Sequence, residues 1–189
     1  MKLLQDRILA EGRVEEGGIL KVDSFLNHQI DVDLYNKIGY EFYKKFKDRG
    51  ITKILTIEAS GIGIACITAQ YFKVPVVFAK KTESKNLDKE TYESEVYSFT
   101  KDRNYKIRVS KRYINNQDKI LIIDDFLANG KAVMGLSDII NQADAKLIGV
   151  GIVIEKGFQD GGKLLRNKGL DVYSLAVIKS MDNGTVEFE

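Results

Sequence analysis

The chain has 189 residues, of which 44% are hydrophobic and 30% charged, and this composition excludes an intrinsically disordered or low-complexity protein. The 29 basic and 27 acidic side chains leave a net charge of +2, which does not indicate the basic surface that nucleic-acid-binding proteins usually carry. The longest apolar stretch is far shorter than the ~18 residues of a membrane helix, and the single cysteine, Cys66, can form neither an internal disulfide nor a zinc site, so we expect a soluble, cytoplasmic protein with no membrane partner.

The first fifty residues predict two helices. We expect a short helix over residues 3–11 and a longer one over 31–48, with Asp31 or Asp33 as the N-cap of the second helix and Gly50 at its end. The apolar face of this second helix consists of side chains at four-residue steps, namely Leu34, Ile38, Phe42 and Phe46.

Apolar segments and helical segments alternate through the rest of the chain. Further helices are predicted at 61–72 and at about 131–141. Strands composed almost wholly of apolar residues are predicted at 54–57, 76–79, 120–123, 147–154 and 172–178. Because such strands separated by helices are typical of a parallel sheet covered on both faces, the sequence predicts an α/β fold.

A long polar stretch, residues 80–118, follows the second of these strands. Within it, residues 95–100 and 105–110 alternate between apolar and polar side chains and flank the segment 101–104, so we expect an antiparallel hairpin. Long insertions at the carboxyl end of a strand are often binding arms or lids.

The most informative residues are the acid pair Asp124-Asp125, directly after the predicted strand 120–123. A small-residue turn and a helix start, 128–132, come next. Ligands of parallel sheets bind beyond the carboxyl ends of the strands, and backbone N–H groups at a helix start suit a phosphate. Carboxylates accept hydrogen bonds from sugar hydroxyls, so the pattern predicts a ribose 5-phosphate site. The alternative is that the acid pair only ends a strand and caps the next helix.

A second glycine-bearing loop, Glu58 to Gly63, follows the first of the predicted strands. Small residues let backbone amides approach an anion closely. A dinucleotide-binding fingerprint is the alternative, but Cys66 stands where its third glycine belongs and no acidic residue ends the strand 76–79. We expect Cys66 itself to be buried and inert.

The segment Ile120 to Ala132 resembles the phosphoribosyl-diphosphate signature of the type I phosphoribosyltransferases. The sequence Ala128-Asn129-Gly130 within it is similar to that of the bacterial members that act on xanthine. This resemblance implies an α/β fold with a mainly parallel central sheet, helices on both faces, a hairpin arm and a small hood. It further implies one domain over residues 1–189, with the hood formed by about 1–30 and the C-terminal segment, and a flexible arm at about 80–118.

The resemblance also implies an activity. The chain is expected to transfer the 5-phosphoribosyl group of 5-phospho-α-D-ribose 1-diphosphate (PRPP) to xanthine in purine salvage, giving XMP and diphosphate. Mg²⁺ is expected to arrive with the diphosphate rather than on protein ligands, and the chain is expected to form a homodimer. Two alternatives stay open, namely a transferase for another purine base such as guanine or hypoxanthine, and a non-catalytic purine-sensing regulator that binds nucleic acid.

Site residues are assigned by the same resemblance. The ribose hydroxyls are assigned to Asp124 and Asp125, the 5-phosphate to Ala128, Asn129, Gly130, Lys131 and Ala132, the diphosphate to Ala59, Ser60 and Gly61, and xanthine to Leu20, Asn27 and Lys156. Without the resemblance, Lys156 would be a solvated lysine at a strand end. Roles for Phe158 and for the pair Lys80-Lys81 are left open.

Overall fold

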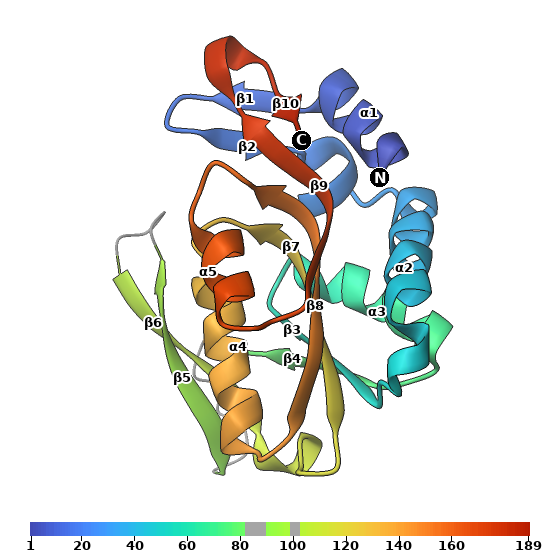
Figure 1. Ribbon diagram of the computed structural model, residues 1–189, viewed down its shortest axis with the longest axis vertical. Coiled ribbons are helices and arrows are strands. Elements are labelled where there is room, and N and C mark those ends of the chain that lie inside the picture. The colour runs from blue at the N-terminus through green and yellow to red at the C-terminus, as the bar shows by residue number, and fades with distance from the viewer. Residues whose placement is uncertain (82–89, 99–102) are drawn as a thin grey trace.

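The computed structural model describes residues 1–81, 90–98 and 103–189, and its centre is a six-stranded sheet (Figure 1). The strands lie in the order β10-β9-β8-β7-β3-β4, and every neighbouring pair is parallel except β10 with β9. Their bounds are β3 Lys53–Ile57, β4 Val76–Ala79, β7 Lys119–Leu127, β8 Lys146–Lys156, β9 Val172–Ser180 and β10 Glu187–Phe188. The predicted α/β fold with a mainly parallel sheet is confirmed.

One strand differs from its prediction at the acid pair. The sequence predicts a strand that ends at Ile123, whereas β7 continues through Asp124 and Asp125 to Leu127. The reason is that β7 stays paired with β8 as far as Leu127, which lies opposite Glu155. The pairing of β3 with β7 ends earlier, at Leu55 and Ile122. The acid pair is therefore part of a strand, beyond the point where β3 leaves it.

Helices cover both faces of the sheet (Figure 1). α1 Lys2–Glu11, α2 Val32–Phe46 and α3 Gly61–Phe72 pack on one face, and α4 Lys131–Gln142 and α5 Gly161–Asn167 pack on the other. The sequence predicts the first four of these helices, and α5 is an additional element. None of the helices in the described part of the chain is long and apolar enough to cross a membrane.

The cap and the apolar face predicted for α2 are confirmed. The side chain of Asp31 accepts a hydrogen bond from the backbone N–H of Leu34 at 3.0 Å. The four predicted face residues are at most 3% exposed, namely Leu34, Ile38, Phe42 and Phe46. A short 3-10 turn, Lys47–Arg49, follows α2, and Gly50 ends it with a φ of 66°, in the left-handed region that favours glycine.

The predicted hairpin consists of β5 Thr91–Ser98 and β6 Arg103–Ser110, which pair in antiparallel register. Its first strand begins four residues earlier than the predicted start at Glu95, because Thr91 pairs with Ser110. The inward side chains of the hairpin join the buried cluster that also contains α4 residues, and they are Val96, Ile107 and Val109. Two parts of the predicted arm, residues 82–89 and 99–102, lie outside the described residues.

The N-terminal hairpin lies at the end of the molecule toward which β7, β8 and β9 run (Figure 1). It consists of β1 Arg13–Glu15 and β2 Ile19–Lys21, and a short π-helix, Asp23–Asn27, follows it. The C-terminal strand β10 lies at the same end (Figure 1). The N- and C-terminal segments thus sit together beyond the carboxyl ends of the parallel strands, where the hood is expected.

Candidate functional site

A cavity of about 220 Å³ lies at the acid pair. Its lining combines the acid pair, the end of β3 and the loop after it, the start of α4, and single residues after β4 and in β6. These residues are Ile57, Glu58, Ala59, Ser60, Gly61, Lys81, Tyr105, Asp124, Asp125 and Ala132. The structure therefore brings the predicted ribose residues and the predicted diphosphate residues to one hollow. Tyr105 of the hairpin is a lining residue that the sequence analysis missed. The position of Tyr105 in an alternating strand gives no signal that its ring faces a cavity.

The two carboxylates of the acid pair differ in exposure. Asp124 is 4% exposed, and its Oδ1 accepts a hydrogen bond from the backbone N–H of Asp125 at 3.0 Å. Burial, and then the negative charge of Asp125, raise the pKa of Asp124 well above its ordinary value. Asp125 is partly exposed, and its own Oδ1 accepts from the backbone N–H of Phe126. The pair is thus a group of adjacent acidic oxygens whose ionised form a cation or several hydroxyl groups would stabilise.

A metal ion could share this charge. Among the described residues, no three His, Cys, Asp or Glu side chains cluster as a metal site. The adjacent carboxylates of Asp124 and Asp125 are nevertheless the hard oxygen donors that Mg²⁺ prefers. The donor set fits a Mg²⁺ ion that takes its remaining ligands from water and substrate.

The loop after β3 is pressed against the acid pair. A Cβ atom built on Gly61 would overlap Thr56 Oγ1 and lie 3.2 Å from Asp124 Oδ1, so only glycine fits there. The peptide bond between Glu58 and Ala59 is cis. The Glu58 carboxylate accepts a hydrogen bond from the backbone N–H of Lys81, which ties this loop to the residues after β4.

Tyr35 of α2 supports the same loop from the other side. It is 1% exposed, and a Cβ atom built on Gly63 would lie 2.9 Å from its ring. Its hydroxyl group donates a hydrogen bond to the carbonyl oxygen of Leu26 at 2.6 Å. Burial, and then the charge of Asp125, raise the pKa of Tyr35 to about 12, so the hydroxyl keeps its proton. Tyr35 therefore connects the π-helix with the start of α3.

The loop after the acid pair, which we call the phosphate loop (residues 128–130), joins β7 to α4. Gly130 has a φ of 74°, which allows the chain to turn sharply into α4. A cavity of about 200 Å³ is lined by this loop and by three ring side chains, namely Tyr97, Tyr105 and Phe126. The free N–H groups at the start of a helix carry partial positive charge, so the turn suits an anion. All five predicted phosphate residues, 128–132, line this cavity.

The three predicted xanthine residues lie apart from these two cavities. Leu20 of β2 is 6% exposed, and Asn27 is exposed at the end of the π-helix. Lys156 ends β8, and its Nζ donates a hydrogen bond to the carbonyl oxygen of Gly18 at 2.8 Å. Burial lowers the pKa of Lys156. The structure thus brings Lys156 to the hairpin that carries Leu20, while neither cavity is lined by Leu20, Asn27 or Lys156.

The expectation for Cys66 is wrong, because its side chain is exposed. The buried face of α3 consists of Gly61, Ile64, Ala65, Thr68 and Ala69. Cys66 lies outside this face. An apolar helix sequence predicts burial, but only one face of α3 packs on the sheet.

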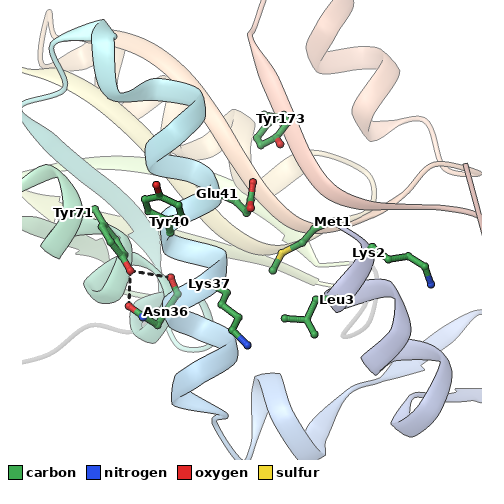
Figure 2. A pocket seen from close by; sticks show the side chains of 9 residues that line it. All are labelled: Met1, Lys2, Leu3, Asn36, Lys37, Tyr40, Glu41, Tyr71 and Tyr173. Atoms are coloured by element: carbon green, nitrogen blue, oxygen red, sulfur yellow. Dashed lines mark hydrogen bonds between the residues drawn. The ribbon is translucent and has the colours of Figure 1, made fainter.

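A larger cavity, of about 490 Å³, lies between α1, α2, α3 and β9 (Figure 2). It is lined by Met1, Lys2, Leu3, Asn36, Lys37, Tyr40, Glu41, Tyr71 and Tyr173. Within it, the Tyr71 hydroxyl donates a hydrogen bond to Asn36 Oδ1 at 2.7 Å (Figure 2). Size alone does not make this hollow the functional site, because none of the predicted site residues lines it.

The chain is similar to known proteins along nearly its whole length. A family model described as "Phosphoribosyl transferase domain" matches residues 21–187. A protein from Ruminiclostridium cellulolyticum named "Xanthine phosphoribosyltransferase" is 68% identical over 100% of this chain and 99% of its own length. A protein of the same name from Clostridioides difficile is 64% identical over 100% of both chains.

Solved structures resemble the chain in fold. The adenine phosphoribosyltransferase of Giardia lamblia, complexed with 9-deazaadenine, superposes with a TM-score of 0.78 over 92% of this chain and 96% of its own, at 20% identity. The enzyme of Rhodothermus marinus gives a TM-score of 0.75 over 94% and 100%, at 18% identity. At these identities the likeness concerns the fold alone.

Proposed function

The chain belongs to the phosphoribosyl transferase family, and we propose that within it the chain transfers the 5-phosphoribosyl group of PRPP to xanthine. The products are XMP and diphosphate, and the reaction serves purine salvage. Relatives that are 57–68% identical over 100% of this chain carry the name xanthine phosphoribosyltransferase. The observation that carries the proposal is the cavity in which the acid pair faces the loop after β3, with the phosphate loop close by.

The acid pair is proposed to hold the ribose. Departure of diphosphate leaves positive charge on the sugar ring, and carboxylates beside the ring stabilise that charge. Asp124 and Asp125 would also accept hydrogen bonds from the ribose hydroxyl groups. Mg²⁺ that arrives with the diphosphate would neutralise charge on the leaving group, and Asp124 and Asp125 are the residues that would hold it. The chain needs no covalent nucleophile, because alignment and charge stabilisation suffice.

The two loops are proposed to hold the two ends of PRPP. Backbone N–H groups of Ala59, Ser60 and Gly61 would donate to the diphosphate, and those of the phosphate loop and the start of α4 to the 5-phosphate. Lys81 lines the acid-pair cavity, so its ammonium group can face the diphosphate as well. Xanthine then attacks the anomeric carbon from the face opposite the leaving group.

The base is proposed to lie between the N-terminal hairpin, β1 and β2, and the end of β8. The Lys156 ammonium group would donate to one xanthine oxygen, and the Asn27 amide would read another edge of the base. Leu20 would pack against the purine ring. An adenine amino group opposite Lys156 would set donor against donor, so this arrangement favours an oxo-purine.

The domain organisation, the assembly and the location of the chain are proposed as follows. The whole chain, 1–189, would act as one domain with a hood from about 1–30 and the C-terminal segment. A homodimer is the expected assembly. The single cysteine is unpaired, which agrees with the reducing cytoplasm as the expected location.

A base panel tests the proposed function. The purified chain is incubated with PRPP, MgCl₂ and one of four bases, and nucleotide formation is measured for xanthine, guanine, hypoxanthine and adenine. We expect the highest kcat/KM for xanthine. A preference for another base would replace xanthine as the substrate, and no turnover with any base would contradict a transferase. The double variant Asp124→Asn/Asp125→Asn is the control, and it should remain folded without turnover.

A further inference from the structure

Glu155 and Arg166 form a bidentate ion pair, and neither residue is among the proposed substrate contacts. Arg166 donates from both terminal nitrogens to the two Glu155 oxygens at 2.7 Å each. The hydroxyl group of Ser174 donates a third hydrogen bond to the same carboxylate. Glu155 is 4% exposed, so this buried charge is held by a nearly complete set of donors. Burial opposes its ionisation, but the hydrogen bonds from Arg166 and Ser174 outweigh burial and lower the pKa of Glu155.

The pair joins the central sheet to the short helix α5. Glu155 lies in β8, where it is paired with Leu127 of β7 on one side and with Val177 of β9 on the other. Its position is therefore fixed by the sheet. Arg166 lies in α5, which has only seven residues and buries Leu165 as its one large apolar side chain. A helix of this length has little stability of its own, so its position depends on the contacts at its ends.

The first residues of α5 touch the phosphate loop. The backbone N–H of Gly161 donates to the carbonyl oxygen of Ala128 at 3.1 Å. A Cβ atom built on Gly161 would overlap that same oxygen and lie 2.6 Å from the Gly130 nitrogen. From the loop side, a Cβ atom on Gly130 would lie 3.4 Å from the side chain of Leu165. α5 thus forms the wall behind the phosphate loop.

The ion pair and this wall are in direct contact. A Cβ atom built on Gly162 would overlap Glu155 Oε1 and lie 2.6 Å from Arg166 Nη1. Adjacent glycines therefore let α5 press on the phosphate loop with Gly161 and on the Glu155 carboxylate with Gly162. In addition, Glu155 lies beside Leu127, the last residue of β7 before the loop. Sheet, ion pair, helix and loop form one continuous series of contacts.

We infer that Glu155 and Arg166 are positioning residues for the sugar phosphate: their ion pair holds α5, and α5 holds the phosphate loop in its anion-binding form. The inference rests on the proposed function only in assigning a phosphate to this loop. A loop that is held in its binding form before the ligand arrives loses less conformational entropy on binding. Loosening α5 should therefore weaken the binding of a sugar phosphate more than the binding of the base.

The test replaces Arg166 by a residue of the same charge. Arg166→Lys keeps a cation near Glu155 but cannot donate two parallel hydrogen bonds. Calorimetric titration with ribose 5-phosphate is compared with steady-state KM values for PRPP and for xanthine. We expect the Kd for ribose 5-phosphate and the KM for PRPP to rise about five- to twenty-fold, with the KM for xanthine changed less than twofold. This is less than the roughly ten- to hundred-fold effect of losing one charged hydrogen bond at a direct contact, because the ion pair acts on the loop through α5.

A matched control uses the same chemical change at an exposed ion pair. Arg49 contacts Asp171 at 3.3 Å, and the Arg49 side chain is 51% exposed. Arg49→Lys should leave all three constants unchanged. Should Arg166→Lys fold poorly, Ser174→Ala removes only one donor from Glu155 and should produce a smaller change in the same direction.

Two results would overturn the inference. One is an unchanged Kd for ribose 5-phosphate in a variant whose thermal unfolding shows that the ion pair has been weakened. The other is an equal rise in both KM values, which would make the pair a general stabiliser. If the parent protein binds ribose 5-phosphate but turns over no base, the proposed function fails while the calorimetric comparison still decides this inference.

Discussion

Gly61 packs so closely against Thr56 that a side chain at position 61 would overlap the Thr56 hydroxyl oxygen. The same side chain would crowd Asp124, 3.2 Å away. We expect Gly61→Ala to lower the free energy of unfolding by about 1–3 kcal/mol, the usual cost of overpacking, and to weaken PRPP binding because the loop must move. Urea unfolding and calorimetry measure the two effects.

Thr56 offers a rescue for this variant. Its Oγ1 is buried without a hydrogen-bond partner among the described residues, so removing it breaks no hydrogen bond. In the double variant Gly61→Ala/Thr56→Ala, the new methyl group occupies space that the hydroxyl group has left. The two changes should therefore be non-additive, with the double variant more stable than the sum of the single losses implies. Simple additivity would show that the collision is not the cause.

The acid pair predicts a pH-dependent stability difference. The pKa of Asp124 is raised in the folded state by burial and then by Asp125, so ionisation of Asp124 opposes folding. This penalty is absent below the ordinary carboxyl pKa of 3.8 and develops as pH rises through the folded value. Asp124→Asn cannot ionise. We expect its free energy of unfolding, relative to the parent protein, to increase with pH, while catalytic turnover is lost.

The measurement is urea unfolding of both proteins across pH 3.5–8. Asp48→Asn, at an exposed position after α2, is the control and should show no such trend. A relative stability of Asp124→Asn that stays flat or falls as pH rises would mean that Asp124 is not destabilised by its surroundings.

Two glycines with similar backbone angles separate conformational strain from function. Gly130 has a φ of 74° in the phosphate loop, and Gly169 has a φ of 82° in open space. Alanine at either position should lower the free energy of unfolding by about 1–2 kcal/mol, because the left-handed region is unfavourable for residues with a Cβ. Only Gly130→Ala should also weaken the binding of ribose 5-phosphate in calorimetry. Equal binding by both variants would exclude the loop from the phosphate site.

The alternation of strands and helices is predictable because buried strands of a parallel sheet are continuous apolar runs. The end of β7 is not predictable from the sequence. Asp124 and Asp125 interrupt the apolar run, and the sequence therefore predicts a strand that ends at Ile123. Backbone pairing with β8 nevertheless continues to Leu127. Side-chain polarity reports burial, whereas the length of a strand depends on the backbone of its neighbour.

The wall behind the phosphate loop has no comparable sequence signal. α5 has seven residues and begins with two glycines, so it lacks the apolar periodicity that identifies a helix. The ion pair that holds α5 joins Glu155 to Arg166, and its significance depends on where α5 lies. The loop itself, in contrast, is predictable, because a strand, an acid pair and a helix start are contiguous in the chain. Local patterns are visible in a sequence, and contacts between separate elements are not.

Lys156 has both a position that the sequence predicts and a long-range contact that it does not. The sequence places it at a strand end, but its contact with the carbonyl oxygen of Gly18 spans 138 positions. In the proposed function its ammonium group donates to a xanthine oxygen. We expect Lys156→Ala to lower kcat/KM for xanthine, with little change in the KM for PRPP. The loss of transition-state stabilisation should be about 1.5–3 kcal/mol, the usual contribution of a charged hydrogen bond. Lys146→Ala, at the exposed start of the same strand, is the control. Equal kcat/KM values for the Lys156 variant and the parent protein would remove Lys156 from the base site.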